Sequence, residues 1–205
     1  EFSKINPGFL SKILTIPIVS ELELYQNPIN PIALNSAYYQ FKLSLAKSLK
    51  KQLEHLLDQA KKHSLEKWPK GDGHRKLIEV IWSLLILNGN QTIRNEALEA
   101  INGTSMTLAK AALNSLVPVN CPERDEGLNL FFNKWKNNPV VLDSWFNLQS
   151  SIQREDSIEF VQELLNHPLF DPIAPNSIRA VLGGFSKNVT SFHSNEGKGY
   201  LFIAE

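Results

Sequence analysis

The histidines and carboxylates of this 205-residue chain are the groups that could bind a catalytic metal, and their spacing argues against it. A zinc peptidase requires two histidines one helical turn apart, with a glutamate directly after the first, in the pattern H-E-x-x-H. No histidine here is followed by glutamate, and none has a second histidine at that spacing; the five are His55, His63, His74, His167 and His193. His63 and Glu66 lie three residues apart, which we interpret as a helix end. The sequence predicts no metal site and no catalytic residue in this chain.

Motifs for nucleophilic or phosphate chemistry are also missing from the sequence. Gly183 and Gly184 lack the spacing of a phosphate-binding loop, and we expect them to end a helix with a glycine in the left-handed region. There is no G-x-S-x-G elbow for a serine hydrolase. Cys121 lies before Pro122, near a predicted helix start, where a thiol pKa can be lowered. We favour the simpler interpretation that Cys121 is a small residue at a helix start.

One arginine lies beside an unusually long polar loop. Arg179 occupies the start of a short predicted helix, and a glycine-bearing loop through His193 and Gly197 follows that helix. Loops of this length in a compact helical protein are more often functional or firmly held than idle. A guanidinium at this place could bind a carboxylate or carbonyl of a ligand, or hold a carboxylate across an interface. An arginine in a first helical turn is also commonly a surface residue, so the residue alone leaves both possibilities open.

Composition excludes several classes of function. The chain is 42% hydrophobic and 20% charged with zero net charge, as is usual for a soluble globular protein with one sizeable core. Residues 42–76 hold ten Lys or Arg against four Asp or Glu, but only Trp68 joins them, so we expect a solvated helix face and no nucleic-acid partner. No apolar run reaches the roughly 20 residues of a membrane helix, so no membrane partner is expected. A single cysteine and the lack of a secretory signal favour a cytoplasmic location.

Helix signals recur along the whole chain. Asn30-Pro31 and Asn138-Pro139 each combine a capping residue with a proline at the first helical position. Apolar residues spaced by three or four from Leu34 to Ala60 predict one long helix. In total we expect about eight helices joined by short turns, and no strand. Helix–turn–helix units of this length stack into solenoids, so the predicted fold is an all-α superhelical α-solenoid of armadillo/HEAT-like helix pairs.

The C-terminal third of the sequence carries a family resemblance. It resembles the C-terminal helical domain of bacterial aminopeptidase N, a family of zinc metallo-aminopeptidases of the gluzincin type. The residues that carry it are Pro175-Asn176-x-Ile178-Arg179-x-Val181-Leu182-Gly183-Gly184-Phe185, then Phe192-His193 and Gly197-x-Gly199-Tyr200, with Leu142-Asp143-x-Trp145-Phe146 and Asn30-Pro31-Ile32-Ala33 upstream. The resemblance covers nearly the whole chain. It implies that residues 1–205 are a fragment of that domain, without the catalytic domain and its zinc.

The resemblance also implies a role for the chain. In the family this domain closes over the catalytic domain, walls the substrate cavity and restricts access to peptides, while the parent enzyme removes N-terminal residues. Arg179 matches an arginine that faces this cavity. The expected partners are the catalytic and other domains of the parent chain and, through them, peptide substrates. The fragment alone is expected to be inactive.

Two features of the sequence complicate this interpretation. Ala174-Pro175-Asn176 departs from the family's usual Asn-Pro-Asn, which removes the side-chain cap expected before the helix. The chain also ends within an apolar pattern, so we expect a solenoid truncated at its C-terminal end, with apolar surface exposed around Tyr200, Phe202 and Ile203. The alternative is a free-standing helical-repeat scaffold that binds a protein or peptide on its concave surface.

Overall fold

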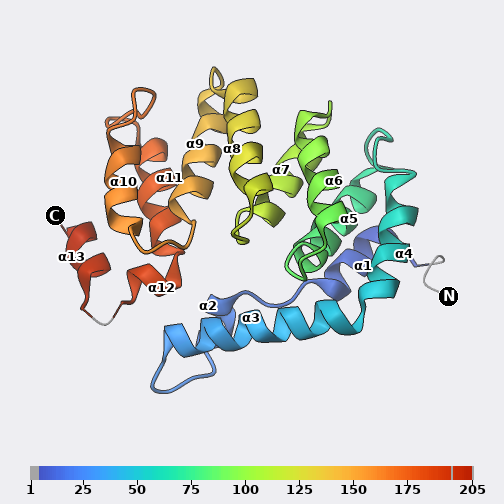
Figure 1. The fold of residues 1–205 in the computed structure, drawn as a ribbon, viewed down its shortest axis with the longest axis horizontal. Helices are drawn as coiled ribbons and strands as arrows, with labels where there is room; N and C mark the ends of the chain where they lie inside the picture. Colours follow the sequence, from blue (N-terminus) through green and yellow to red (C-terminus); the bar gives the residue numbers. More distant parts are fainter. Residues whose placement is uncertain (1–4, 195, 205) are drawn as a thin grey trace. The chain divides into compact units, whose positions relative to one another are not determined.

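Helices account for all the regular secondary structure in the part of the chain that is described. The computed structural model describes residues 5–194 and 196–204, and no strand occurs among them (Figure 1). The helices are α1 (Pro7–Leu14), α2 (Val19–Glu23), α3 (Pro31–Ser48), α4 (Lys50–Lys61), α5 (Asp72–Leu85), α6 (Gln91–Asn102), α7 (Met106–Leu116), α8 (Pro122–Trp135), α9 (Pro139–Ser150), α10 (Ser157–Leu165), α11 (Pro175–Ser186), α12 (Val189–Phe192) and α13 (Lys198–Ala204). The all-α prediction is confirmed, although the described helices outnumber the eight expected. None of them is both long and apolar enough to cross a membrane.

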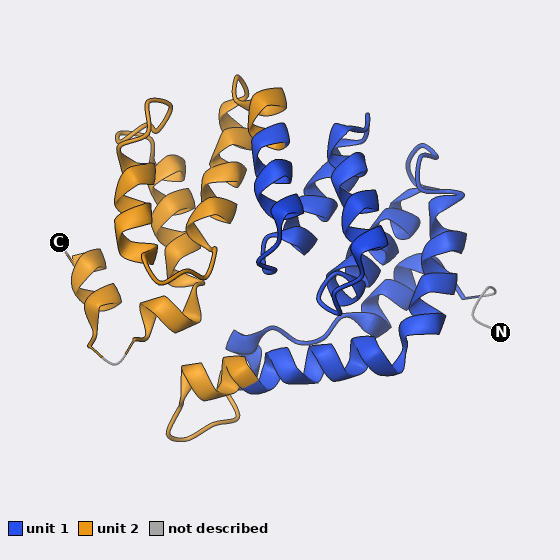
Figure 2. Ribbon diagram, viewed as in Figure 1, with its two compact units in different colours: residues 1–22, 37–130 blue, residues 23–36, 131–205 orange. Residues whose placement is uncertain are grey.

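The chain divides into two compact units (Figure 2). Unit 1 comprises residues 1–22 and 37–130, and unit 2 comprises residues 23–36 and 131–205. Helices α3 and α8 each contain a boundary between the units. Each unit has its own buried apolar residues, and we describe the two separately.

Several helices begin directly after a residue whose side chain caps the first turn. The side chain of Asn30 accepts a hydrogen bond from the backbone N–H of Ala33 at 3.0 Å, and α3 begins at Pro31. Asn138 accepts from Val141 before α9, Asn90 from Ile93 before α6, and Ser105 from Leu108 before α7. A side-chain oxygen at this position satisfies one of the otherwise unpaired N–H groups of the first turn. The starts predicted at Asn30-Pro31 and Asn138-Pro139 depended only on local sequence, and they are confirmed.

The single long helix expected from Leu34 to Ala60 is wrong, because the helix breaks at Leu49. This residue has φ −102° and ψ 10°, outside helical geometry, and it separates α3 from α4. The apolar spacing continues through the break, but the two helices bury different amounts of surface. Only Ala46 of α3 is buried, whereas Leu53, Leu57 and two further residues of α4 are buried, and α4 packs on α5.

Unit 1 is built around α5. Ile81 and Leu85 of this helix are fully buried, and α5 packs on α1, α4 and α7. Helix α1 comes very close to α5, since a Cβ atom added at Gly73 would lie 2.8 Å from the backbone nitrogen of Gly8. Trp82 of α5 is also buried. Unit 1 therefore depends on one central helix with neighbours on several sides.

Unit 2 is built around the pair formed by α9 and α11. Phe131, Phe146 and Phe185 are fully buried, and α10 packs on both helices of the pair. Trp145 is 6% exposed and lies against Phe132, with ring centroids 4.7 Å apart. Trp145 is therefore part of the core of unit 2, whereas Trp135 of α8 is half-buried.

The glycine pair of α11 does not end the helix, contrary to the sequence prediction. Helix α11 continues to Ser186, and neither Gly183 nor Gly184 has a positive φ. A Cβ atom at Gly184 would lie 2.0 Å from Oγ of Ser150 and 2.5 Å from the carbonyl oxygen of Asn147, both on α9. Gly184 is required because α9 and α11 touch at this point, and a side chain has no room there.

The polar loop expected after α11 is shorter than predicted, because α12 and α13 form within it. Between these helices Gly197 adopts the left-handed conformation, with φ +66°. Tyr200 and Ile203 are exposed, at 52% and 39%. Phe202 is half-buried against Phe185, with ring centroids 5.6 Å apart. The exposure predicted for this region is therefore confirmed for Tyr200 and Ile203, whereas Phe202 packs inward.

The two adjacent glycines of α11 provide a matched test of this packing. Gly184→Ala should lower the free energy of unfolding by about 2 kcal/mol, because the methyl group must displace α9. Gly183→Ala should raise it by about 0.5–1 kcal/mol, since nothing lies within 4 Å of the added Cβ and alanine favours the helix. Urea denaturation of both variants measures the difference. Equal effects of the two substitutions would contradict the close contact at Gly184.

Candidate functional site

Arg179, the only candidate site residue from the sequence, lies on α11 in unit 2. Helix α11 begins at Pro175 even though Ala174 makes no side-chain cap. The preceding segment is held instead by Asp171, whose Oδ1 accepts hydrogen bonds from the backbone N–H groups of Ile173 and Ala174 at 2.9 and 3.2 Å. The helix therefore starts at Pro175 despite the departure from the family pattern, and Arg179 lies in its second turn, one turn later than the sequence analysis placed it.

Polar contacts fix the first two turns of α11 against α9. The Ser177 hydroxyl donates to Oδ1 of Asp143 at 2.7 Å, and Nδ2 of Asn147 donates to the carbonyl oxygen of Ala180 at 2.9 Å. Both contacts are partly buried, where a hydrogen bond is weakened little by competing water. Arg179 lies between Ser177 and Ala180 along the helix. Its backbone is therefore held on either side by α9.

The side chain of Arg179 takes no part in these contacts. The residue is exposed, and within the described ranges it makes no hydrogen bond, ion pair or ring contact. A guanidinium offers five N–H donors in a planar fork that matches a carboxylate or a pair of carbonyls. The backbone on either side of Arg179 is held by α9, and its guanidinium has no partner among the described residues. The guanidinium can therefore bind an anionic or carbonyl group from outside unit 2. The sequence did not indicate that Arg179 lacks a carboxylate partner among the described residues of its own unit.

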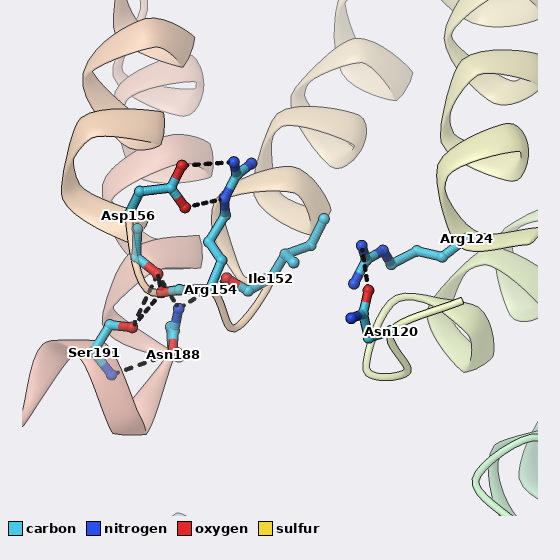
Figure 3. A network of polar contacts seen from close by, with 8 residues as sticks. Asn120, Arg124, Ile152, Arg154, Asp156, Asn188 and Ser191 are labelled. Atoms are coloured by element: carbon cyan, nitrogen blue, oxygen red, sulfur yellow. Dashed lines mark hydrogen bonds and ion pairs between the residues drawn. The ribbon is translucent and has the colours of Figure 1, made fainter. Parts of the chain in front are cut away.

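A second group of polar contacts in unit 2 was not predicted from the sequence (Figure 3). Asn188 is fully buried, and its Nδ2 donates to the carbonyl oxygen of Ile152 at 2.9 Å and to Oγ of Ser157 at 3.2 Å. The Ser157 hydroxyl also lies 2.9 Å from that of Ser191 and donates to the carbonyl oxygen of Arg154. The signal that could have revealed this group is the capping position of Asn188 before α12. Because Asn188 is buried, its Asn-Val-Thr sequence is not an exposed glycosylation site.

Arg154 extends the same group toward solvent. Its guanidinium donates to both carboxylate oxygens of Asp156, at 2.6 and 2.8 Å, and lies 4.1 Å from the ring centroid of Phe160. The hydrogen bond from Arg154 lowers the pKa of Asp156. Figure 3 also includes a contact within unit 1, where Arg124 donates to Oδ1 of Asn120 at 3.1 Å.

A cavity of about 650 Å³ lies beside these residues in unit 2. Arg154 and Lys198 contribute positive charges to its wall, and Glu155, Glu159 and Glu196 contribute negative charges. Arg154 is paired with Asp156, and Lys198 is paired with Glu196. These two cations are neutralised locally, so the cavity presents no strong preference for an anionic ligand.

The histidines do not assemble a metal centre in the part of the chain that the structure describes. No group of three or more His, Cys, Asp or Glu side chains there is placed to hold an ion. Nδ1 of His63 lies 2.6 Å from Oε1 of Glu66, and the rings of His63 and His74 are 5.0 Å apart. Burial, and then the charge of His63, lower the pKa of His74. His193 contacts the hydroxyl of Tyr200 instead of a second histidine.

Cys121 has the environment of a structural residue. It is 4% exposed in unit 1, and burial raises the pKa of its thiol. A reactive cysteine requires a lowered pKa and access to solvent, and Cys121 has neither. The interpretation of Cys121 as a small residue at the start of α8 is confirmed.

Comparison with known proteins identifies the family to which the chain belongs. A family model described as a domain of unknown function (DUF3458_C) with ARM repeats matches residues 2–205. The chain belongs to the DUF3458_C family. Its ARM repeats correspond to the stacked helix pairs of an α-solenoid, so the predicted fold class is confirmed.

Relatives of this DUF3458_C chain are aminopeptidases. It is 30% identical to Aminopeptidase N of Escherichia coli (strain K12) over 207 residues, and 26% identical to Aminopeptidase N of Caulobacter vibrioides over 218 residues. A solved structure of Legionella pneumophila aminopeptidase A in complex with aspartic acid matches with a TM-score of 0.85 and 30% identity. Each match covers 98% of this chain but only 23%, 24% and 25% of the relative. The chain thus matches the C-terminal helical domain of aminopeptidase N-like proteins.

Substitution of Asn188 tests the buried polar group of unit 2. Asn188→Ala should lower the free energy of unfolding by about 2 kcal/mol, because the carbonyl of Ile152 loses its donor while it remains buried. Asn176→Ala is the control, since this exposed asparagine makes no polar contact with the described residues and should change stability by less than about 0.5 kcal/mol. Chemical denaturation measures both. A cost for Asn188→Ala no larger than that of the control would contradict the assignment.

Proposed function

We propose that residues 1–205 are the C-terminal helical domain of a zinc aminopeptidase that removes N-terminal residues from peptides. Membership of the DUF3458_C family and the similarity to aminopeptidases of three bacteria support this proposal. The chain spans about a quarter of the length of these relatives, which favours a domain of a larger enzyme over a free-standing scaffold. The two compact units together make up this domain.

The proposed role of the domain is to wall the active-site cavity and to limit entry to peptides. The described residues provide no cluster that fits zinc, so the metal would be bound by the catalytic domain of the parent chain. The helical domain then contributes by excluding bulk water and by holding the substrate in place, while the chemical step occurs elsewhere. Its partners are the other domains of the same chain and the peptide substrate. The chain by itself has no peptidase activity in this account.

Arg179 is the proposed contact between the domain and the peptide. The observation that carries this assignment is its exposed guanidinium on a helix held on both sides by α9. A guanidinium in this position can donate to the backbone carbonyls or the terminal carboxylate of a bound peptide. The fixed backbone at Arg179 favours binding, because a positioned donor loses less conformational entropy when it binds than a mobile one.

Replacement of Arg179 in the full-length enzyme tests the assignment. Arg179→Ala should lower kcat/KM for peptides by about 10- to 100-fold, which is the usual effect of removing a charge-assisted hydrogen bond. The melting temperature should change little, because the side chain makes no polar or ring contact with the described residues of its unit. Lys187→Ala, at an exposed position just after α11, is the matched control and should leave kinetics unchanged. Unchanged kinetics of Arg179→Ala for peptides of several lengths would remove the proposed role.

A further inference from the structure

Unit 1 contains a small cavity with a cation in its wall. The cavity has a volume of about 210 Å³ and lies between α3, α5 and the segment that follows α1. Leu14, Ile16, Ile18, Val80 and Leu84 supply most of its apolar surface. Lys42 and Tyr38, one turn apart on the same face of α3, supply polar atoms. An apolar pocket with a few polar groups is the usual form of a small-molecule site.

Lys42 is unusual because no described residue of unit 1 neutralises its charge. The residue is half-buried, and it forms no ion pair or hydrogen bond with any described residue. Its ammonium group makes a cation–π contact with Tyr38, whose ring centroid lies 5.8 Å from Nζ. Glu21 lies near the edge of the cavity, but its carboxylate accepts from the backbone N–H of Ile18 at 3.2 Å and does not reach Lys42. Burial lowers the pKa of Lys42, as expected for a cation without a counter-ion.

Two other lysines of unit 1 have carboxylate partners. Lys61 is paired with Glu96 at 2.7 Å, and Lys76 is paired with Asp72 at 2.8 Å. These ammonium groups have carboxylate partners within unit 1, whereas Lys42 is directed at an apolar cavity. A half-buried ammonium that lacks a carboxylate is stabilised by any anion that can reach it. The environment therefore selects a ligand that brings its own negative charge.

We propose that this cavity binds a small molecule with a carboxylate attached to a compact apolar body. The carboxylate would pair with Nζ of Lys42, and the apolar body would fill the space lined by Leu14, Ile16 and Val80. An engineered cavity of about 150 Å³ holds benzene, so the present volume suits a body of about six carbon atoms. A free amino acid fits less well, because its own ammonium would lie near that of Lys42. The site does not depend on Arg179 or on the proposed aminopeptidase activity.

Two sources share this chemistry: a free carboxylic acid, and the C-terminal residue of a peptide with an apolar side chain. 4-Methylpentanoate represents the first and N-acetyl-leucine the second. Whichever of the two binds more tightly identifies the source, and saturable binding of either supports the site. The neutral isostere 4-methylpentanamide serves as the control for charge.

Isothermal titration calorimetry with the full-length protein tests the proposal. Lys42→Met should weaken binding of the acid at least about tenfold, as should replacement of the acid by its amide, since each change removes a charge-assisted contact. Lys47→Met, at an exposed position on the same helix, should leave the affinity unchanged. Val80→Phe should abolish binding by filling the cavity while Lys42 is retained, and its melting curve shows whether it folds. No saturable binding, or equal affinity of the wild type and Lys42→Met, would overturn the proposal.

Discussion

The close contact between α9 and α11 is the constraint on which the candidate site depends. It is possible because Gly184 has no side chain where α11 meets Ser150 and Asn147 of α9. At this separation the Ser177 hydroxyl reaches Asp143, and the side chain of Asn147 reaches the carbonyl of Ala180. A larger residue at Gly184 would separate the helices and break both contacts. The backbone position of Arg179 thus depends on packing several residues further along its helix.

Much of the fold could be predicted because its signals are local. Asn30 and Asn138 mark helix starts through capping bonds that involve only their own neighbours in sequence. The break at Leu49 could not be predicted, since it depends on which residues of α3 and α4 are buried against other helices. The same limit applies to Gly184, because a glycine that ends a helix and a glycine that admits a neighbouring helix look alike in sequence.

The candidate site could be predicted only in part. The position of Arg179 near the start of a helix followed from the sequence, and its link to a substrate cavity came from the family resemblance. The absence of a carboxylate partner for Arg179 among the described residues could not be predicted, because it depends on tertiary packing. Lys42 was counted among a basic stretch, and nothing in sequence separates it from Lys61 or Lys76. Only the folded chain brings Lys42 to Ile16 and Val80, which are distant in sequence.

Arg179 and Lys42 share one physical property in two separate units. Each cation lacks a carboxylate partner among the described residues, whereas Lys61, Lys76 and Arg154 are paired. Their surroundings differ, since Arg179 is exposed and Lys42 is half-buried beside apolar side chains. A guanidinium in solvent suits a large partner with planar acceptor groups, and a desolvated ammonium suits a small ligand. We therefore propose ligands of different size for the two cations.

We propose that Arg179 is the residue through which this domain contacts the peptide substrate of a larger enzyme. A structure of the full-length parent protein with a bound peptide analogue tests it most directly. We expect the guanidinium of Arg179 to lie on the wall of the cavity that holds the peptide analogue, within hydrogen-bonding distance of that analogue. An Arg179 side chain on the outer surface of the enzyme, with the analogue enclosed by other domains, would contradict the claim.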